Sequence, residues 1–235
     1  MLTTNKVLEI FQELDLYLDE LTEENYQDRL IDPLMDAVDR ELLPEFEIFT
    51  GASKVVISFI DTDFVIKIPF NGTFDSIYDE EIDDYIEEEF VPFCGAGEYC
   101  DDNCWDYCSL EVERFQAALD EEVDECFVET VYIGSVNNYP IYAQELVEMY
   151  DYSEHDFEHS NKKDELEKTS SLCKSNKVTC FHTNWLTDAR KYYGEEFFIK
   201  LLKFIDNYCI RDLHSGNLGY ICGRPIIVDY ASFEG

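Results

Sequence analysis

Three polar side chains near the C-terminus have the types and spacing that metal-assisted phosphate chemistry needs. Asp212 and Asn217 lie five residues apart, and Asp229 ends an apolar run that predicts a strand. A carboxylate such as Asp212 can orient or deprotonate an acceptor hydroxyl, and the oxygens of Asn217 and Asp229 are hard ligands suited to Mg²⁺ on nucleotide phosphates. A short hairpin through residues 219–225 is expected to bring the two loops side by side.

The apolar periodicity predicts the elements that must position these side chains. Residues 45–70 contain three short β-rich runs, and residues 127–133 and 141–146 predict a hairpin that turns at Asn137 and Asn138. Helical spacing predicts four helices: one from about residue 4, capped by Thr3 or Thr4, and others over 23–43, 110–119 and 184–208. The expected fold class is α+β, with an antiparallel sheet and accompanying helices.

Residues 71–108 differ sharply in composition from their surroundings. They contain 13 acidic side chains, no Lys or Arg, and four of the nine cysteines. We expect an insertion that is partly helical over residues 77–90. The spacing of its cysteines does not match the paired knuckles of structural zinc sites, so reduced thiols are favoured over a zinc site. These cysteines are Cys94, Cys100, Cys104 and Cys108.

The charge of the chain limits its partners. The 53 acidic and 17 basic side chains give a net charge of −36 over 235 residues, and Arg114 is the only Lys or Arg between Lys67 and Lys162. Direct nucleic-acid binding is therefore not expected, because phosphate contacts need Lys and Arg. Two alternatives remain open: the acidity serves solubility alone, or it attracts a basic protein surface, as a mimic of nucleic-acid charge would.

Other classes of protein are not expected from the composition. Phe and Tyr together number 33, and 46% of the residues are hydrophobic, which argues against intrinsic disorder. Residues 1–10 lack the pattern of a signal peptide, and no apolar run approaches the length of a membrane span. We therefore expect a cytoplasmic protein that does not bind membranes and has reduced cysteines.

The order of these features resembles the protein-kinase-like superfamily, including small kinase-like proteins of bacteria and their phages. The resemblance covers residues 45–235, with its specific motifs at Lys67 and in residues 211–231. It implies a protein-kinase-like α+β fold. In that fold residues 1–44 form a helical extension, residues 45–147 form an antiparallel N-lobe with the insertion at 71–108, and residues 148–235 form an abbreviated helical C-lobe.

The resemblance implies that ATP binds in the N-lobe. Lys67 would hold the α- and β-phosphates, and Glu111, or alternatively Glu113, would pair with it. Gly51 would belong to the turn that covers the phosphates, although this turn lacks the three glycines of a phosphate-wrapping loop. The main chain near Glu145 would meet the adenine ring.

The same resemblance assigns the chemistry to the C-lobe. Asp212 would be the catalytic base, and Asn217 and Asp229 would hold Mg²⁺. Residues 212–217 are also similar to the Asp-Leu-His-x-Gly-Asn loop of aminoglycoside- and choline-kinase relatives, which phosphorylate small molecules. Two residues depart from the usual pattern: Ile210 replaces a histidine, and Tyr230 replaces a phenylalanine.

Two functions are compatible with this sequence. The first is an ATP- and Mg²⁺-dependent phosphotransferase of the bacterial or phage-infected cytoplasm, with an unknown acceptor. The second is a kinase-fold binding protein, weak or inactive in catalysis, whose acidic surface regulates a basic partner. The four residues Lys67, Asp212, Asn217 and Asp229 favour the first function. The charge and the expected absence of an activation segment after Gly235 favour the second.

Overall fold

The chain folds into two compact units. The computed structural model describes residues 2–51, 53–79, 84–92, 106–150, 183–210 and 213–231. The first unit comprises residues 1–109 and 130–146, and the second comprises residues 110–129 and 147–235. No helix in these described ranges is long and apolar enough to span a bilayer.

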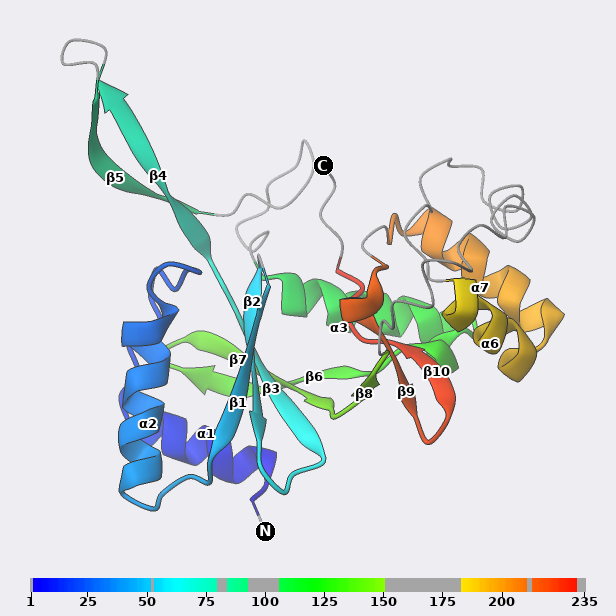
Figure 1. Ribbon diagram of the computed structural model, residues 1–235, viewed down its shortest axis with the longest axis horizontal. Helices are drawn as coiled ribbons and strands as arrows, with labels where there is room; N and C mark the ends of the chain where they lie inside the picture. The colour runs from blue at the N-terminus through cyan, green and yellow to red at the C-terminus, as the bar shows by residue number, and fades with distance from the viewer. Residues whose placement is uncertain are drawn as a thin grey trace. The chain divides into compact units, whose positions relative to one another are not determined.

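The first unit is built on a five-stranded antiparallel sheet (Figure 1). Its strands follow the order β1-β2-β3-β7-β6. Their bounds are β1 Phe46–Gly51, β2 Lys54–Phe59, β3 Phe64–Pro69, β6 Thr130–Val136 and β7 Tyr139–Glu145. The expected antiparallel sheet and the α+β class are thereby confirmed. The predicted turn of the β6–β7 hairpin is also confirmed. Asn137 and Asn138 have φ angles of 50° and 68°, which Asn tolerates better than most residues.

Two N-terminal helices complete the core of the first unit. Helix α1 (Thr4–Glu13) begins as expected at Thr3, whose hydroxyl accepts a hydrogen bond from the Lys6 N–H at 3.3 Å. Val7 and Phe11 are fully buried in one cluster with Ile57 and Ile66 of the sheet. The N-terminal helices therefore belong to the same hydrophobic core as the strands.

The second N-terminal helix is shorter and less regular than predicted. Instead of one helix over residues 23–43, a π-helical turn η1 (Gln27–Ile31) leads into α2 (Asp32–Asp39). Pro33 in the first turn of α2 has no N–H to donate to the preceding turn, which agrees with the widened turn there. The helix stops before Pro44 because Glu41 adopts a left-handed φ of 58°. The Leu42 N–H then donates a hydrogen bond to the Ala37 carbonyl at 2.9 Å, which ends the helix.

The described residues of the second unit form three helices and a small antiparallel sheet. Helix α3 (Tyr107–Asp120) begins in the first unit and continues into the second. The sheet has the strand order β10-β9-β8, and short 3₁₀ turns precede β6 and β9. The other bounds are η2 Asp124–Cys126, β8 Glu148–Met149, α6 Thr183–Tyr193, α7 Glu195–Asn207, η3 Ser215–Asn217, β9 Leu218–Ile221 and β10 Arg224–Ile227.

The single helix predicted over residues 184–208 is two helices. Gly194 separates α6 from α7 with a φ of +83°, a conformation that glycine adopts without steric cost. Phe198, Leu202 and Phe204 of α7 are buried in the core of the second unit together with Trp185 of α6.

The helix predicted over residues 77–90 is wrong. Strands β4 (Gly72–Asp79) and β5 (Asp84–Pro92) instead form a separate two-stranded antiparallel sheet. Cys94, Cys100 and Cys104 of the predicted reduced-thiol set lie outside the described residues, whereas Cys108 is buried and forms no disulfide.

Candidate functional site

The strongest candidate site lies at the open end of the β9–β10 hairpin. Its register pairs Leu218 with Ile227, and the Val228 N–H donates a hydrogen bond to the Asn217 carbonyl at 3.0 Å. Asn217 is buried and Asp229 is half-buried. The hairpin thus brings the backbone of Asn217 next to that of Val228, the residue before Asp229, although the two residues predicted as Mg²⁺ ligands are 12 positions apart in the sequence.

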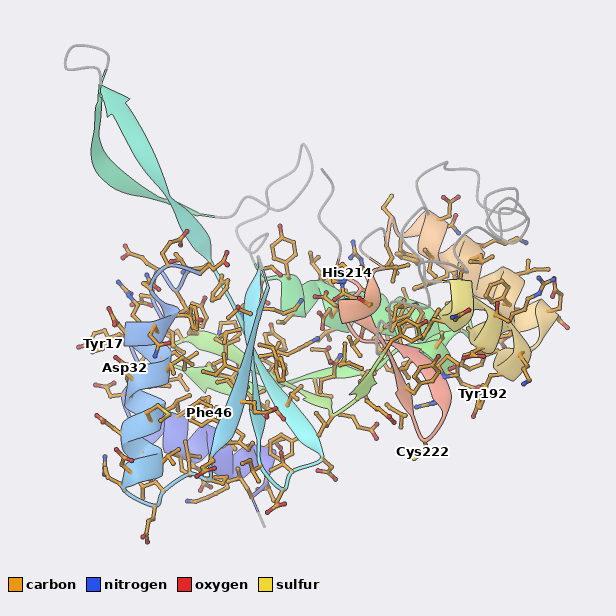
Figure 2. The ribbon with its side chains drawn as sticks, in the orientation of Figure 1. Tyr17, Asp32, Phe46, Tyr192, His214 and Cys222 are labelled. Carbon is orange, nitrogen blue, oxygen red and sulfur yellow. The ribbon has the colours of Figure 1, made fainter. Side chains whose placement is uncertain are left out.

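The η3 turn fixes the backbone of Asn217 on its N-terminal side. Figure 2 shows His214 beside the η3 turn and Cys222 at the opposite end of the hairpin. His214 Nδ1 accepts a hydrogen bond from the Gly216 N–H at 3.0 Å, and the His214 carbonyl accepts one from the Asn217 N–H at 2.9 Å. In neutral imidazole this leaves Nε2 as the protonated nitrogen. A Cβ at residue 216 would lie 2.8 Å from His214 Cε1, so a larger residue there would displace the His214 ring from this hydrogen bond.

Tyr230, the residue after Asp229, forms hydrogen bonds through both its backbone carbonyl and its side-chain hydroxyl. The Tyr230 carbonyl accepts a hydrogen bond from Arg114 Nη1 of α3 at 2.5 Å, and its hydroxyl donates one to the Val128 carbonyl at 2.7 Å. The Tyr230 ring packs edge-on against Phe127 with the ring centroids 5.0 Å apart. Tyr230 therefore fills an apolar position of the core and also satisfies a buried carbonyl.

The scaffold behind the hairpin is equally constrained. The Tyr150 N–H donates to the Leu218 carbonyl at 2.9 Å, and Trp185 Nε1 donates to the Gly219 carbonyl at 3.2 Å. A Cβ at residue 219 would lie 2.4 Å from Val147 Cγ1 and 2.7 Å from the Glu148 carbonyl oxygen. Only glycine permits β8 and β9 to approach this closely.

The predicted phosphate-binding lysine lies in the first unit. Lys67 occupies the middle of β3, opposite Val56 of β2 and Tyr142 of β7, and only 3% of it is exposed. The Tyr142 hydroxyl donates to Asp106 Oδ2. Burial, and then this hydrogen bond, raise the pKa of Tyr142, so the hydroxyl stays protonated and remains a donor.

The two glutamates considered as partners of Lys67 differ in exposure. Glu111 is fully buried in α3, whereas Glu113 on the same helix is exposed. Both belong to the second unit, while Lys67 belongs to the first. Burial makes Glu111 the better candidate for a residue that must be paired with an opposite charge.

The remaining predicted residues are less constrained. Gly51 is exposed at the end of β1, and Glu145 is exposed at the end of β7. The Leu146 N–H donates to the Asp63 carbonyl at 2.8 Å, so this amide is already used within the first unit and is a poor donor for an adenine ring. Asp212 lies outside the described residues.

Arg114 is the residue of this site that the sequence reasoning missed. Its one visible signal was its isolation, because no other Lys or Arg occurs between Lys67 and Lys162. An isolated cation in so acidic a chain is a candidate for a specific contact. The Tyr230 carbonyl provides that contact.

The donor set suits Mg²⁺ that arrives with a nucleotide. Mg²⁺ in such sites is bound by one or two protein oxygens together with substrate phosphates, and Asn217 and Asp229 supply that number. The described part of the chain contains no group of three or more His, Cys, Asp or Glu side chains arranged to hold a metal. Comparisons of the chain with protein-family models, with curated proteins and with solved structures found no match.

Proposed function

We propose that this protein is a kinase-like phosphotransferase that binds ATP with Mg²⁺. The observation that supports the proposal most strongly is that the backbone segments of Asn217 and Asp229 adjoin at the open end of the β9–β10 hairpin, through the hydrogen bond from the Val228 N–H to the Asn217 carbonyl. Hydrogen bonds of the Val228 N–H with the Asn217 carbonyl and of the Tyr230 carbonyl with Arg114 fix the backbone on both sides of Asp229. A fixed pair of oxygen ligands is what a metal-bound triphosphate requires.

Each predicted residue has a defined task in this proposal. Lys67 holds the phosphates and Glu111 balances its charge. Asn217 and Asp229 hold the Mg²⁺, which neutralises charge on the transferring phosphoryl group. Asp212 orients or deprotonates the acceptor hydroxyl. Because the net charge of −36 repels ATP, these local cations have to offset the field of the whole protein.

A set of three single variants tests the proposal. Asp229→Asn should remove the Mg²⁺-dependent part of ATP binding and abolish phosphate transfer, while the fold persists. Asp212→Asn should bind Mg-ATP normally but turn over about 10²- to 10⁴-fold more slowly, the usual contribution of a positioned base. Lys67→Met should weaken both Mg-ATP binding and phosphate transfer. Transfer of labelled phosphate from ATP to water or small hydroxyl acceptors is the measurement, and equal behaviour of all three variants and the wild type would refute the proposal.

A second candidate function, the regulation of a basic partner protein through an acidic surface, is supported by the acidic hairpin β4–β5. It forms a sheet of its own, and its strands contain six acidic residues and no basic residue. A basic protein surface would relieve the repulsion among these carboxylates. In this case the triple change of Glu87, Glu88 and Glu89 to Gln should remove the cellular effect of the protein, while Lys67→Met and Asp229→Asn preserve it. The opposite outcome favours the phosphotransferase.

A further inference from the structure

The η3 turn before Asn217 is closed by a side chain as well as by the backbone. His214 occupies its N-cap position with an extended backbone, φ −95° and ψ 177°, and the ring Nδ1 accepts the Gly216 N–H at 3.0 Å. The His214 carbonyl accepts the Asn217 N–H at 2.9 Å, and the Ser215 carbonyl accepts the Leu218 N–H. His214 therefore contributes two of the hydrogen bonds that shape this turn, one through its ring and one through its backbone.

The His214 ring lies closely against Gly216. A Cβ at residue 216 would lie 2.8 Å from Cε1 and 3.0 Å from Nδ1 of this ring, so the absence of a side chain there leaves room for the imidazole. His214 itself is exposed, so burial of apolar surface does not account for a ring at this position. The chain thus combines a side-chain acceptor with the residue type that lets it reach the N–H two positions later.

A turn of this length has little stability of its own. Short 3₁₀ segments have poorer hydrogen-bond geometry than α-helices, and their first N–H groups have no partner within the segment. A capping side chain supplies one. Asn217 is the last residue of η3, and its carbonyl accepts the N–H of Val228, the residue before Asp229. A loosened turn would therefore displace Asn217 relative to the backbone that leads into Asp229.

We propose that His214 is a positioning residue for the metal site, because its ring holds the η3 turn and thereby the oxygen ligand proposed at Asn217. This inference rests on the proposed nucleotide-binding function and deepens it. His214 acts through Gly216 and Asn217, so its loss should weaken the Mg²⁺-dependent part of ATP binding and leave the Mg²⁺-independent part unchanged. Supporting contacts of metal ligands typically change metal affinity by about 10- to 100-fold.

Titration of the full chain with Mg²⁺ at a fixed ATP concentration tests the proposal. His214→Leu should raise the Mg²⁺ concentration for half-maximal ATP binding by about 10- to 100-fold. His214→Asn should retain most of the Mg²⁺ affinity, because an Asn side-chain oxygen can accept the N–H two residues later. Cys222→Ser is the control, since Cys222 is exposed at the opposite end of the same hairpin (Figure 2).

Gly216→Ala tests the hydrogen bond while the imidazole is kept. The added Cβ should displace the ring and reproduce the loss seen in His214→Leu. The double variant should bind Mg²⁺ no more weakly than either single variant, because both changes remove the same interaction. Additive losses would show that the two residues act separately and would overturn the inference.

Amide hydrogen exchange in the metal-free protein measures the turn without nucleotide. The N–H groups of Gly216 and Asn217 should exchange faster in His214→Leu than in the wild type or His214→Asn. Unchanged exchange would overturn the inference. Normal Mg²⁺ dependence in His214→Leu, beside its loss in Asp229→Asn, would also overturn it and leave the proposed function standing. A wild type that binds no Mg-ATP would overturn both.

Discussion

Arg114 and Tyr230 are 116 positions apart, yet Arg114 Nη1 donates a 2.5 Å hydrogen bond to the Tyr230 carbonyl. This contact joins α3 to the residue directly after Asp229. It fixes the backbone there, and the metal-binding role proposed for Asp229 depends on that position. Glu111 lies three positions before Arg114, so one helix contains two of the residues proposed to arrange the site.

Replacing Arg114 should therefore loosen the metal site without removing a ligand. Arg114→Met is expected to raise the Mg²⁺ concentration needed for half-maximal ATP binding by about 10- to 100-fold, as other supporting contacts of metal ligands do. Adenosine binding should not change. Lys191→Met is the control, because Lys191 is exposed on α6. An unaltered Mg²⁺ dependence in a folded Arg114→Met protein would show that the contact is not needed.

The Tyr230 hydroxyl makes a separable contribution to stability. Tyr230→Phe keeps the ring against Phe127 but leaves the buried Val128 carbonyl without this donor. The free energy of unfolding should fall by about 1–3 kcal/mol, with ATP affinity unchanged. Chemical denaturation measures the change. Tyr17→Phe, at a side chain that is 74% exposed, should be silent, and a silent Tyr230→Phe would refute the assignment.

The close approach of β8 and β9 predicts a strong glycine requirement. Gly219→Ala would place a Cβ 2.4 Å from Val147 Cγ1, which should destabilise the second unit by about 1–3 kcal/mol or more. Gly51→Ala is the matched control, since a Cβ there would meet nothing within 4 Å and should change stability by less than about 0.5 kcal/mol. Equal denaturation midpoints for the two variants would contradict the described packing.

The cysteines of the second unit should differ in reactivity. Burial raises the pKa of the Cys126 thiol, so it stays protonated at pH 8 and should resist alkylation until the protein unfolds. Cys222 is exposed in the β9–β10 turn and should be modified quickly. Peptide mapping after brief alkylation measures the extent of modification at Cys126 and at Cys222. Rapid modification of Cys126 in the folded protein would contradict its buried environment.

The sheet of the first unit could be predicted because its signals are local. Alternating apolar residues marked the strands, and consecutive Asn137 and Asn138 marked a turn with positive φ. The long helix over residues 184–208 failed at Gly194, although a glycine after the basic residues Arg190 and Lys191 is a known helix-end signal. The apolar stripe of residues 197–205, which follows Gly194, outweighed that signal in the prediction.

The misassigned and missed features depend on distant partners. Residues 77–90 are rich in Glu, which favours helix, but each of the strands β4 and β5 is stabilised by pairing with the other, and propensity does not register such pairing. At the candidate site, the sequence predicted that Asn217 and Asp229 would be brought together. It could not predict the contact of Arg114 with Tyr230, because the two residues are remote in the chain.

The most direct measurement is the thermal stability of the wild type and of Asp229→Asn in the presence of ATP, with and without Mg²⁺. Ligand at 100 times its Kd stabilises a protein by about 2.7 kcal/mol, which corresponds to a rise in Tm of roughly 5–11 °C for a chain of this size. The account predicts such a rise for the wild type with Mg-ATP, a smaller one without Mg²⁺, and no Mg²⁺-dependent increment for Asp229→Asn. A wild type that shows no shift at millimolar Mg-ATP, or an Asp229→Asn variant that keeps the full increment, would contradict it.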